Sequence, residues 1–135
     1  RSSRGGGRDA ALFSLLVYPV IGGGETASMR RFRDTPMWNA RLNAKMWEYF
    51  GGGRDVLSDG LSVFPAAYVE TAEFDCLHDE GVRFARALER EGVEVTLNRT
   101  RGTMHGFDIA RKSDAAKQAL AARIAALRTA FYGNR

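Results

Sequence analysis

Two residues of this 135-residue chain have the types and the placing for acid–base chemistry, Asp75 and His105. Asp75 ends an alternating apolar run and stands just before a sequence that starts a helix. His105 stands on a turn between Gly102 and Gly106, after the next β-rich run. The carboxyl ends of neighbouring parallel strands meet at one edge of a sheet, where catalytic groups gather. We therefore expect the two side chains to meet there.

The chemistry that this pair can perform is proton transfer. Histidine titrates near neutral pH and can act as a general base, and a buried carboxylate can hold its ring in one tautomer. Taken alone, Asp75 is equally well explained as a cap of the following helix, and His105 as an ordinary loop residue. The pairing favours the interpretation that both belong to a hydrolase triad.

Other reactive residues are weaker candidates. Cys76 adjoins Asp75, but a cysteine at a strand end is usually packed rather than nucleophilic. His78, near a helix start, is interpreted as a surface residue or a support of the site. Two histidines and one cysteine show no metal-ligand spacing, so no metal is expected. The Gly-Gly-Gly runs lack the spacing of a phosphate-binding loop.

Three segments have the pattern of strands that could position these residues. Residues 10–18 are almost all apolar, which is typical of a strand covered on both faces of a parallel sheet, and Pro19 ends it. Residues 65–72 form the second β-rich run. Residues 93–98 alternate as a third strand, and 99–108 are predicted to be turn and loop.

Helices are predicted between and after these strands. Thr35 and Pro36 are expected to begin a helix over residues 37–50 with a broad aromatic face. Asp79 and Glu80 stand in the first turn of the next helix, where its dipole favours carboxylates. The buried face of that helix is expected at Val82, Ala85 and Leu88.

A last helix is predicted to begin at Ser113 or Asp114. Its Arg and Lys residues are expected on one face and its apolar stripe on the other. The stripe consists of Leu120, Ile124, Leu127 and Phe131.

The alternation of elements predicts an α/β fold with about three parallel strands and flanking helices. The first strand is apolar but has no neighbour on its far side in this chain, and an open apolar edge is a liability. We therefore expect the C-terminal part of a bigger sheet, or one half of an assembly. Residues 1–9, rich in Arg, Ser and Gly, are interpreted as a flexible lead-in.

Charge and cysteine content narrow the class of protein. The net charge is +4, but 20 Lys and Arg are interspersed with 16 Asp and Glu, which favours a mixed-charge surface over nucleic-acid binding. A single cysteine excludes an internal disulfide, and with no signal peptide the cytoplasm is the expected compartment. No apolar run approaches the roughly 20 residues that span a bilayer, so no membrane partner is expected.

The motifs together resemble those of one protein family. Leu-Leu-Val-Tyr-Pro-Val at 15–20, Val-Glu-Thr-Ala-Glu-Phe-Asp-Cys-Leu-His-Asp-Glu-Gly at 69–81 and Met-His-Gly-Phe at 104–107 run in the order seen in hormone-sensitive-lipase-like α/β-hydrolase esterases. By this resemblance, Asp75 is the triad acid and His105 the triad base. Residues 22–60 resemble a lid insertion, and 36–40 are similar to small bacterial acetyl-esterase-like members. The resemblance implies short-chain carboxylic ester substrates and no cofactor.

The resemblance also defines what this sequence lacks. The family's nucleophile lies on Gly-x-Ser-x-Gly and its oxyanion hole on a His-Gly-Gly loop, and neither motif occurs here. The chain is therefore expected to be inactive alone and to need a serine from an N-terminal portion. Trp38 and Trp47, either core or lid, and Phe107, which can wall a pocket, are the expected substrate contacts.

An alternative of a different class is a non-catalytic interaction module. Its open first strand would pair with a partner or with a second copy as a homo-oligomer. A third and weaker hypothesis is nucleic-acid binding through the basic N-terminus.

Overall fold

The computed structural model describes residues 11–22, 24–52, 55–58 and 60–133, so the expected lead-in at 1–9 lies outside the described residues. Three parallel strands form one sheet in the order β1-β2-β3. They are β1 (Ser14–Val17), β2 (Ala67–Phe74) and β3 (Val95–Met104). The predicted α/β fold with three parallel strands is confirmed.

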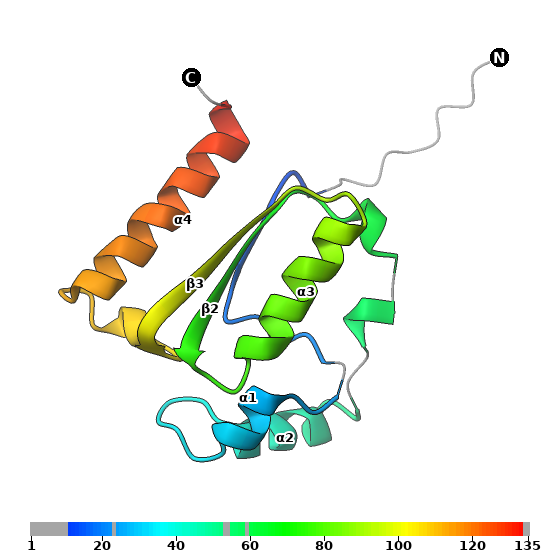
Figure 1. The fold of residues 1–135 in the computed structure, drawn as a ribbon, viewed down its shortest axis with the longest axis vertical. Coiled ribbons are helices and arrows are strands. Elements are labelled where there is room, and N and C mark those ends of the chain that lie inside the picture. The colour runs from blue at the N-terminus through cyan, green and yellow to red at the C-terminus, as the bar shows by residue number, and fades with distance from the viewer. Residues whose placement is uncertain (1–10, 23, 53–54, 59, 134–135) are drawn as a thin grey trace.

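The central strand β2 has both faces covered, because helices lie on opposite sides of the sheet (Figure 1). Alternate residues of β2 therefore face different helices. Ala67 belongs to the core under α3 (His78–Arg90), together with Ile21, Leu61, Phe84 and Leu88. Glu70 faces α4 (Asp114–Tyr132), where it contacts Arg123.

The edge strand β1 differs from the prediction in length and burial. It spans four residues rather than the whole of 10–18, and all four are half-buried rather than covered on both faces. Within the described residues β1 pairs with β2 alone, so one of its edges carries no neighbouring strand.

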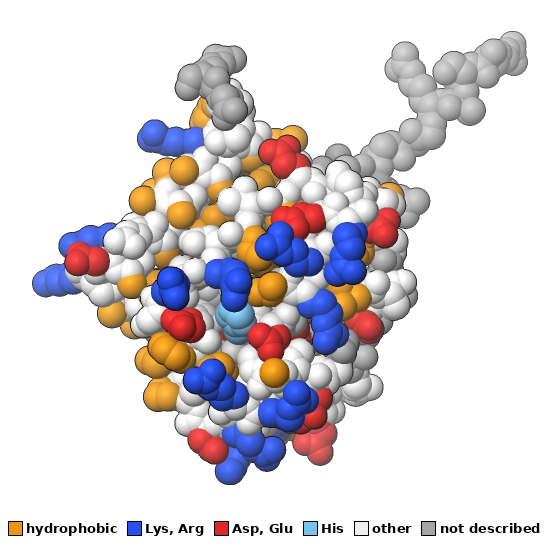
Figure 2. All heavy atoms as spheres, in the orientation of Figure 1, with side chains coloured by type: hydrophobic (Ala, Val, Ile, Leu, Met, Phe, Trp, Pro, Cys, Tyr) orange, Lys and Arg blue, Asp and Glu red, His pale blue; other side chains and the backbone are white. Residues whose placement is uncertain are grey.

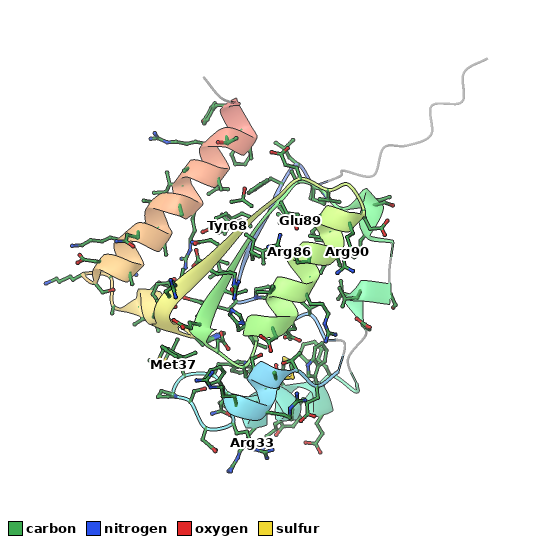
Figure 3. All side chains as sticks on the ribbon, in the orientation of Figure 1. Arg33, Met37, Tyr68, Arg86, Glu89 and Arg90 are labelled. Atoms are coloured by element: carbon green, nitrogen blue, oxygen red, sulfur yellow. The ribbon has the colours of Figure 1, made fainter. Side chains whose placement is uncertain are left out.

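Helix α3 follows the predicted pattern, with Asp79 and Glu80 in its first turn. Ala85 and Leu88 are fully buried as expected, whereas Val82 is half-buried and Phe84 is the large side chain in the core. The opposite face carries Arg86, Glu89 and Arg90, which point away from the sheet (Figure 3).

Helix α4 begins after Ser113, whose side chain accepts a hydrogen bond from the Ala116 N–H, as the sequence predicted. The prediction for its faces was wrong for three of the four residues of the apolar stripe, whereas the fourth, Leu127, is half-buried. Ala116 and Ala119 are the buried residues, and Arg123 is turned toward the sheet. Leu120, Ile124 and Phe131 are 55%, 44% and 59% exposed. Small side chains allow the helix to approach the sheet closely, and these three larger apolar side chains point outward.

The segment between β1 and β2 holds α1 (Ala27–Arg31) and α2 (Ala40–Tyr49), which lie beyond the carboxyl ends of the strands (Figure 1). The predicted start of α2 was wrong, because Asn39 rather than Thr35 caps it by accepting from the Leu42 N–H. Met37 has φ of 69°, outside helical geometry. Helix α1 is capped by Thr26, whose side chain accepts from the Met29 N–H.

Short 3₁₀ turns complete the fold at η1 (Val56–Ser58), η2 (Leu61–Val63) and η3 (Phe107–Ile109). Strand β3 continues to Met104 instead of ending at residue 98, with a register shift between Ala72 and Phe74 of β2. His105 therefore follows the strand directly. No helix in the described part of the chain is long and apolar enough to cross a membrane.

Candidate active site

Asp75 lies at the carboxyl end of β2 and is almost fully buried, with 1% of its surface exposed. Its Oδ1 accepts a hydrogen bond of 3.0 Å from the Leu77 N–H, and its Oδ2 lies 2.8 Å from His105 Nδ1. Asp75 thus closes the turn that leads into α3 and also pairs with the imidazole. It is not the cap of the helix, because that position is Leu77 and no side chain caps it.

His105 lies directly after β3, and its side chain is 24% exposed. The next residue, Gly106, has φ of 74°, a left-handed conformation that glycine adopts without strain. A Cβ at Gly106 would stand 3.2 Å from the Met37 side chain, so the loop that holds His105 packs closely on the segment before α2. Met37 lies beyond the ends of the strands in Figure 3.

The contact between the two side chains determines which nitrogen of His105 can react. A carboxylate only accepts hydrogen bonds, so His105 Nδ1–H donates to Asp75 Oδ2, and this bond fixes the tautomer that carries its proton on Nδ1. The other nitrogen, Nε2, then carries the lone pair that can accept a proton from a nucleophile. The arrangement suits a general base that is oriented by a buried acid.

Aromatic rings surround the imidazole. The Tyr18 ring lies 4.6 Å from the His105 ring, between centroids, and the Trp38 ring lies 6.0 Å from it. Phe107 packs edge-on against Tyr18 at 6.0 Å. Two of the expected substrate contacts, Trp38 and Phe107, are therefore close to the acid–base pair.

The third expected substrate contact, Trp47, lies in a different place. It lines a hollow of about 1040 Å³ formed mainly by α1, α2 and their flanks, together with Met29 and Arg33. Arg33 is labelled below α1 in Figure 3. The described residues that line this hollow include neither Asp75 nor His105.

The surroundings of Cys76 and His78 fit structural rather than catalytic residues. Cys76 is fully buried, and burial together with the adjacent Asp75 charge raises the pKa of its thiol to about 12, so the thiol stays protonated. His78 Nδ1 lies 2.9 Å from Asp79 Oδ1, and Asp79 Oδ2 accepts from the Ser28 N–H. This histidine is half-buried, and it is Asp79 that joins α3 to α1. The described part of the chain holds no group of three side chains suited to a metal ion.

Glu80 links the site to the segment after β1. It is 1% exposed, and its carboxylate oxygens face the backbone N–H groups of Ile21 and Gly22 at 3.4 and 3.3 Å. Burial raises its pKa to about 7, although these two N–H groups act in the opposite direction.

Residues that the sequence reasoning missed lie behind the imidazole. The Tyr18 hydroxyl donates to Asp108, and Arg123 pairs with both Asp108 and Glu70. The one available signal was Glu70, a charged residue in the middle of a β-rich run. A buried charge is strongly unfavourable unless it is paired, so a cationic partner could have been expected.

Comparison with known proteins gives a consistent result. A family model described as "alpha/beta hydrolase fold" matches residues 3–109. Esterase LipI of Mycobacterium tuberculosis is 26% identical over 134 residues, covering 90% of this chain and 42% of LipI. Neutral cholesterol ester hydrolase 1 of Pongo abelii is 44% identical over 46 residues, which are 34% of this chain and 11% of that protein.

Among solved structures, esterase LipW from Mycobacterium marinum superimposes with a TM-score of 0.83 at 30% identity. The match covers 89% of this chain and 41% of LipW. The chain thus spans well under half the length of LipI and of LipW.

Proposed function

This chain belongs to the alpha/beta hydrolase fold family, and we propose that it supplies the acid and the base of a carboxylic-ester hydrolase. The observation that carries the proposal is the 2.8 Å contact between the buried Asp75 carboxylate and His105 Nδ1. The names of its relatives, LipI and LipW among them, are those of esterases. We assign Asp75 as the orienting acid and His105 as the general base.

In the proposed reaction His105 Nε2 removes the proton from a serine hydroxyl, and the serine oxygen attacks the ester carbonyl carbon. The imidazolium, stabilised by Asp75, then gives this proton to the leaving alcohol, and an acyl-enzyme remains. Water enters, loses a proton to the same nitrogen and releases the carboxylic acid and the free serine. No cofactor takes part in this cycle.

The serine and the oxyanion donors must come from outside these 135 residues, because no Gly-x-Ser-x-Gly or His-Gly-Gly occurs in them. We therefore propose that the chain acts as the C-terminal portion of such a hydrolase, and that residues 22–60 form part of its lid. Alone, it is expected to hydrolyse p-nitrophenyl acetate no faster than its His105→Ala variant does.

The substrate in this proposal is a short-chain ester that lies between the aromatic side chains near His105. Trp38 and Phe107 are proposed as substrate contacts, because both lie near the imidazole. A substrate contact of Trp47 stays a prediction, since its hollow lies apart from the acid–base pair.

A chimera tests the acid–base assignment. The segment of LipI that this chain matches is replaced by the chain, and hydrolysis of p-nitrophenyl acetate is measured. His105→Ala and Asp75→Asn are expected to lower kcat by about 10⁴-fold, as loss of a triad member does. The matched control is His78→Ala, which removes the other histidine and should leave kcat within about twofold. A folded, active chimera that tolerates His105→Ala would contradict the proposal.

A second candidate function is an interaction module, and two observations favour it. One edge of β1 has no neighbouring strand among the described residues, and α4 exposes Leu120, Ile124 and Phe131. Either surface can pair with a partner or with a second copy of the chain. Light scattering after size-exclusion chromatography tests self-pairing, and a stable monomer at every concentration would count against it.

A further inference from the structure

A network of buried charges lies between β2 and α4, on the opposite face of the sheet from α3. Glu70 is fully buried, and Arg123 of α4 approaches its Oε1 to 2.6 Å. The other oxygen, Oε2, accepts from the Tyr68 hydroxyl at 2.6 Å and from Asn98 Nδ2 at 3.2 Å. Tyr68 is labelled within the sheet in Figure 3. Because Glu70 is held by two other side chains, Tyr68 and Asn98, it fixes the Arg123 guanidinium rigidly.

The same guanidinium reaches the loop that carries His105. Arg123 Nη1 donates to Asp108 Oδ2 at 2.8 Å, and Asp108 lies three residues after His105 in η3. The second oxygen of Asp108, Oδ1, accepts from the Tyr18 hydroxyl at 3.0 Å. Asp108 therefore joins α4 on one side to the end of β1 on the other.

Tyr18 has an unusual backbone conformation, and its ring lies against the imidazole of His105. Its φ of 49° lies in the left-handed region, which is rare for an aromatic residue. Its backbone N–H donates to the Glu70 carbonyl oxygen, and its ring lies 4.6 Å from the His105 ring with an interplanar angle of 38°. Such strain persists only where the surroundings over-determine the conformation, and it concentrates at functional sites.

We propose that Asp108 is a positioning residue for His105: it fastens the His105 loop to Arg123 and holds the Tyr18 ring against the imidazole. The imidazole is then confined from two directions, by Asp75 at Nδ1 and by Tyr18 on its ring. Asp108 does not touch the reacting atoms and acts through the loop and through Tyr18. The inference rests on the proposed function only in taking His105 as the base.

Electrostatics keep Asp108 charged in this role. Partial burial favours the neutral acid, but the hydrogen bonds from Arg123 and Tyr18 outweigh it and hold the pKa of Asp108 below its usual value. Burial and the hydrogen bond to Asp108 raise the pKa of Tyr18 well above its usual value. Tyr18 therefore stays a donor and Asp108 an acceptor across the physiological pH range.

The test uses the 135-residue chain and NMR of its two histidines, whose ¹⁵N shifts report the tautomer of each ring. In the wild type, His105 is expected to hold the Nδ1–H tautomer with a protected, low-field Nδ1 proton. Asp108→Ala should accelerate exchange of this proton with water by about tenfold, as loss of a charge-assisted hydrogen bond allows. The signals of His78 should stay unchanged and serve as an internal control.

Two milder variants keep the test decisive if Asp108→Ala fails to fold. Asp108→Asn retains an acceptor for Tyr18 and should preserve most of the protection, whereas Tyr18→Phe keeps the ring but loses its hydroxyl and should give an intermediate loss. Asp114→Ala removes an exposed carboxylate from the start of α4 and is expected to change nothing.

Unchanged exchange at His105 in Asp108→Ala would overturn the inference. If that variant is unfolded, unchanged exchange in Tyr18→Phe would overturn it. None of these exchange measurements needs ester turnover, so they can be interpreted even if the proposed function is wrong. In the LipI chimera, the same Asp108→Ala change should lower kcat while leaving KM nearly unchanged.

Discussion

Three acidic residues of this chain meet different surroundings and so acquire different roles. Asp75 is buried but accepts from the Leu77 N–H and pairs with His105. Glu80 is equally buried and accepts long hydrogen bonds from the Ile21 and Gly22 N–H groups, but burial dominates and its pKa rises to about 7. Asp108 has a cation beside it and keeps its charge. The surroundings of these three acids, rather than their residue type, therefore give them different roles.

The pKa of Glu80 predicts a pH-dependent stability. Its value rises from 4.5 in the unfolded chain to about 7 in the fold, so the native state binds the proton more tightly across this window. The free energy of unfolding should therefore fall as pH rises from about 4.5 to about 7, by roughly 1–3 kcal/mol. The Asp75 charge adds to the shift and Arg83 opposes it.

Urea denaturation of the wild type and of Glu80→Gln at several pH values measures this effect. Glutamine does not titrate, so the variant should lose less stability than the wild type as pH rises through the window. Glu89→Gln, on the outer face of the same helix, is the matched control and should follow the wild type. Parallel pH profiles for the wild type and Glu80→Gln would refute the expectation.

At the scale of elements, the contact between Gly81 of α3 and Thr71 of β2 determines how closely the helix approaches the sheet. Gly81 lies in the first turns of α3 directly over Thr71 of β2, and both are buried. A Cβ built on Gly81 would stand 2.7 Å from Thr71 Cγ2, below any real contact distance. Glycine is therefore required here by space and not by backbone conformation.

Gly81→Ala is expected to destabilise the protein, although alanine is the better helix former. Helix propensity favours the change by about 1 kcal/mol. Overpacking against a short, buried and β-branched side chain costs about 1–3 kcal/mol, and Thr71 has little room to move. The net loss should appear in chemical denaturation as a lower midpoint with an unchanged slope.

The partner substitution Thr71→Ser removes Cγ2 and retains the hydroxyl. Combined with Gly81→Ala it should restore part of the stability, so that the double-mutant cycle gives a coupling of about 1 kcal/mol or more. Additive effects of the two substitutions would show that the steric account is wrong.

The same elements show what the sequence could predict. Apolar runs indicated the first two strands and alternation the third. The strand-end positions of Asp75 and His105 indicated that they meet, because parallel topology places such ends together. The end of β3 could not be seen from the sequence, because the stretch after residue 98 is largely polar and the strand is extended by pairing of Arg99, Thr100 and Met104 with β2. Propensity and pattern are local, whereas strand pairing is not.

Helix α4 and the Tyr18–Asp108–Arg123 contacts were unpredictable for related reasons. Helical periodicity shows that two faces differ but not which of them packs, and here the alanine face does. Tyr18 and Asp108 lie 90 residues apart in the sequence, and no local pattern joins them. Only the buried charge of Glu70 pointed to a network.

At the scale of the whole molecule, helix α4 carries several exposed apolar side chains along its length. Figure 2 shows hydrophobic side chains among the charged ones in the region where Figure 1 places α4. Leu120, Ile124 and Phe131 of α4 are 55%, 44% and 59% exposed. Clustered apolar residues of this kind mark an interaction surface more often than scattered ones do.

We expect the 135-residue chain to self-associate weakly through this stripe on α4. Replacing Leu120, Ile124 and Phe131 by Gln removes apolar area while keeping good helix formers, so the helix should persist and the association should weaken. Light scattering after size-exclusion chromatography, repeated over a range of concentrations, measures the mass. Added sulfate should strengthen association of the wild type, because it favours burial of apolar surface.

A matched control distinguishes association through the α4 stripe from nonspecific hydrophobic association. Tyr49, Val63 and Ile109 are at least as exposed, at 78%, 87% and 69%, but lie on three different elements. Replacing them by Gln removes comparable apolar surface without disturbing α4, so this variant should associate as the wild type does. If it dissociates as readily as the α4 variant, or if the wild type remains monomeric in sulfate, the α4 stripe is not the interaction surface. Association that persists in the α4 variant would instead point to the open edge of β1.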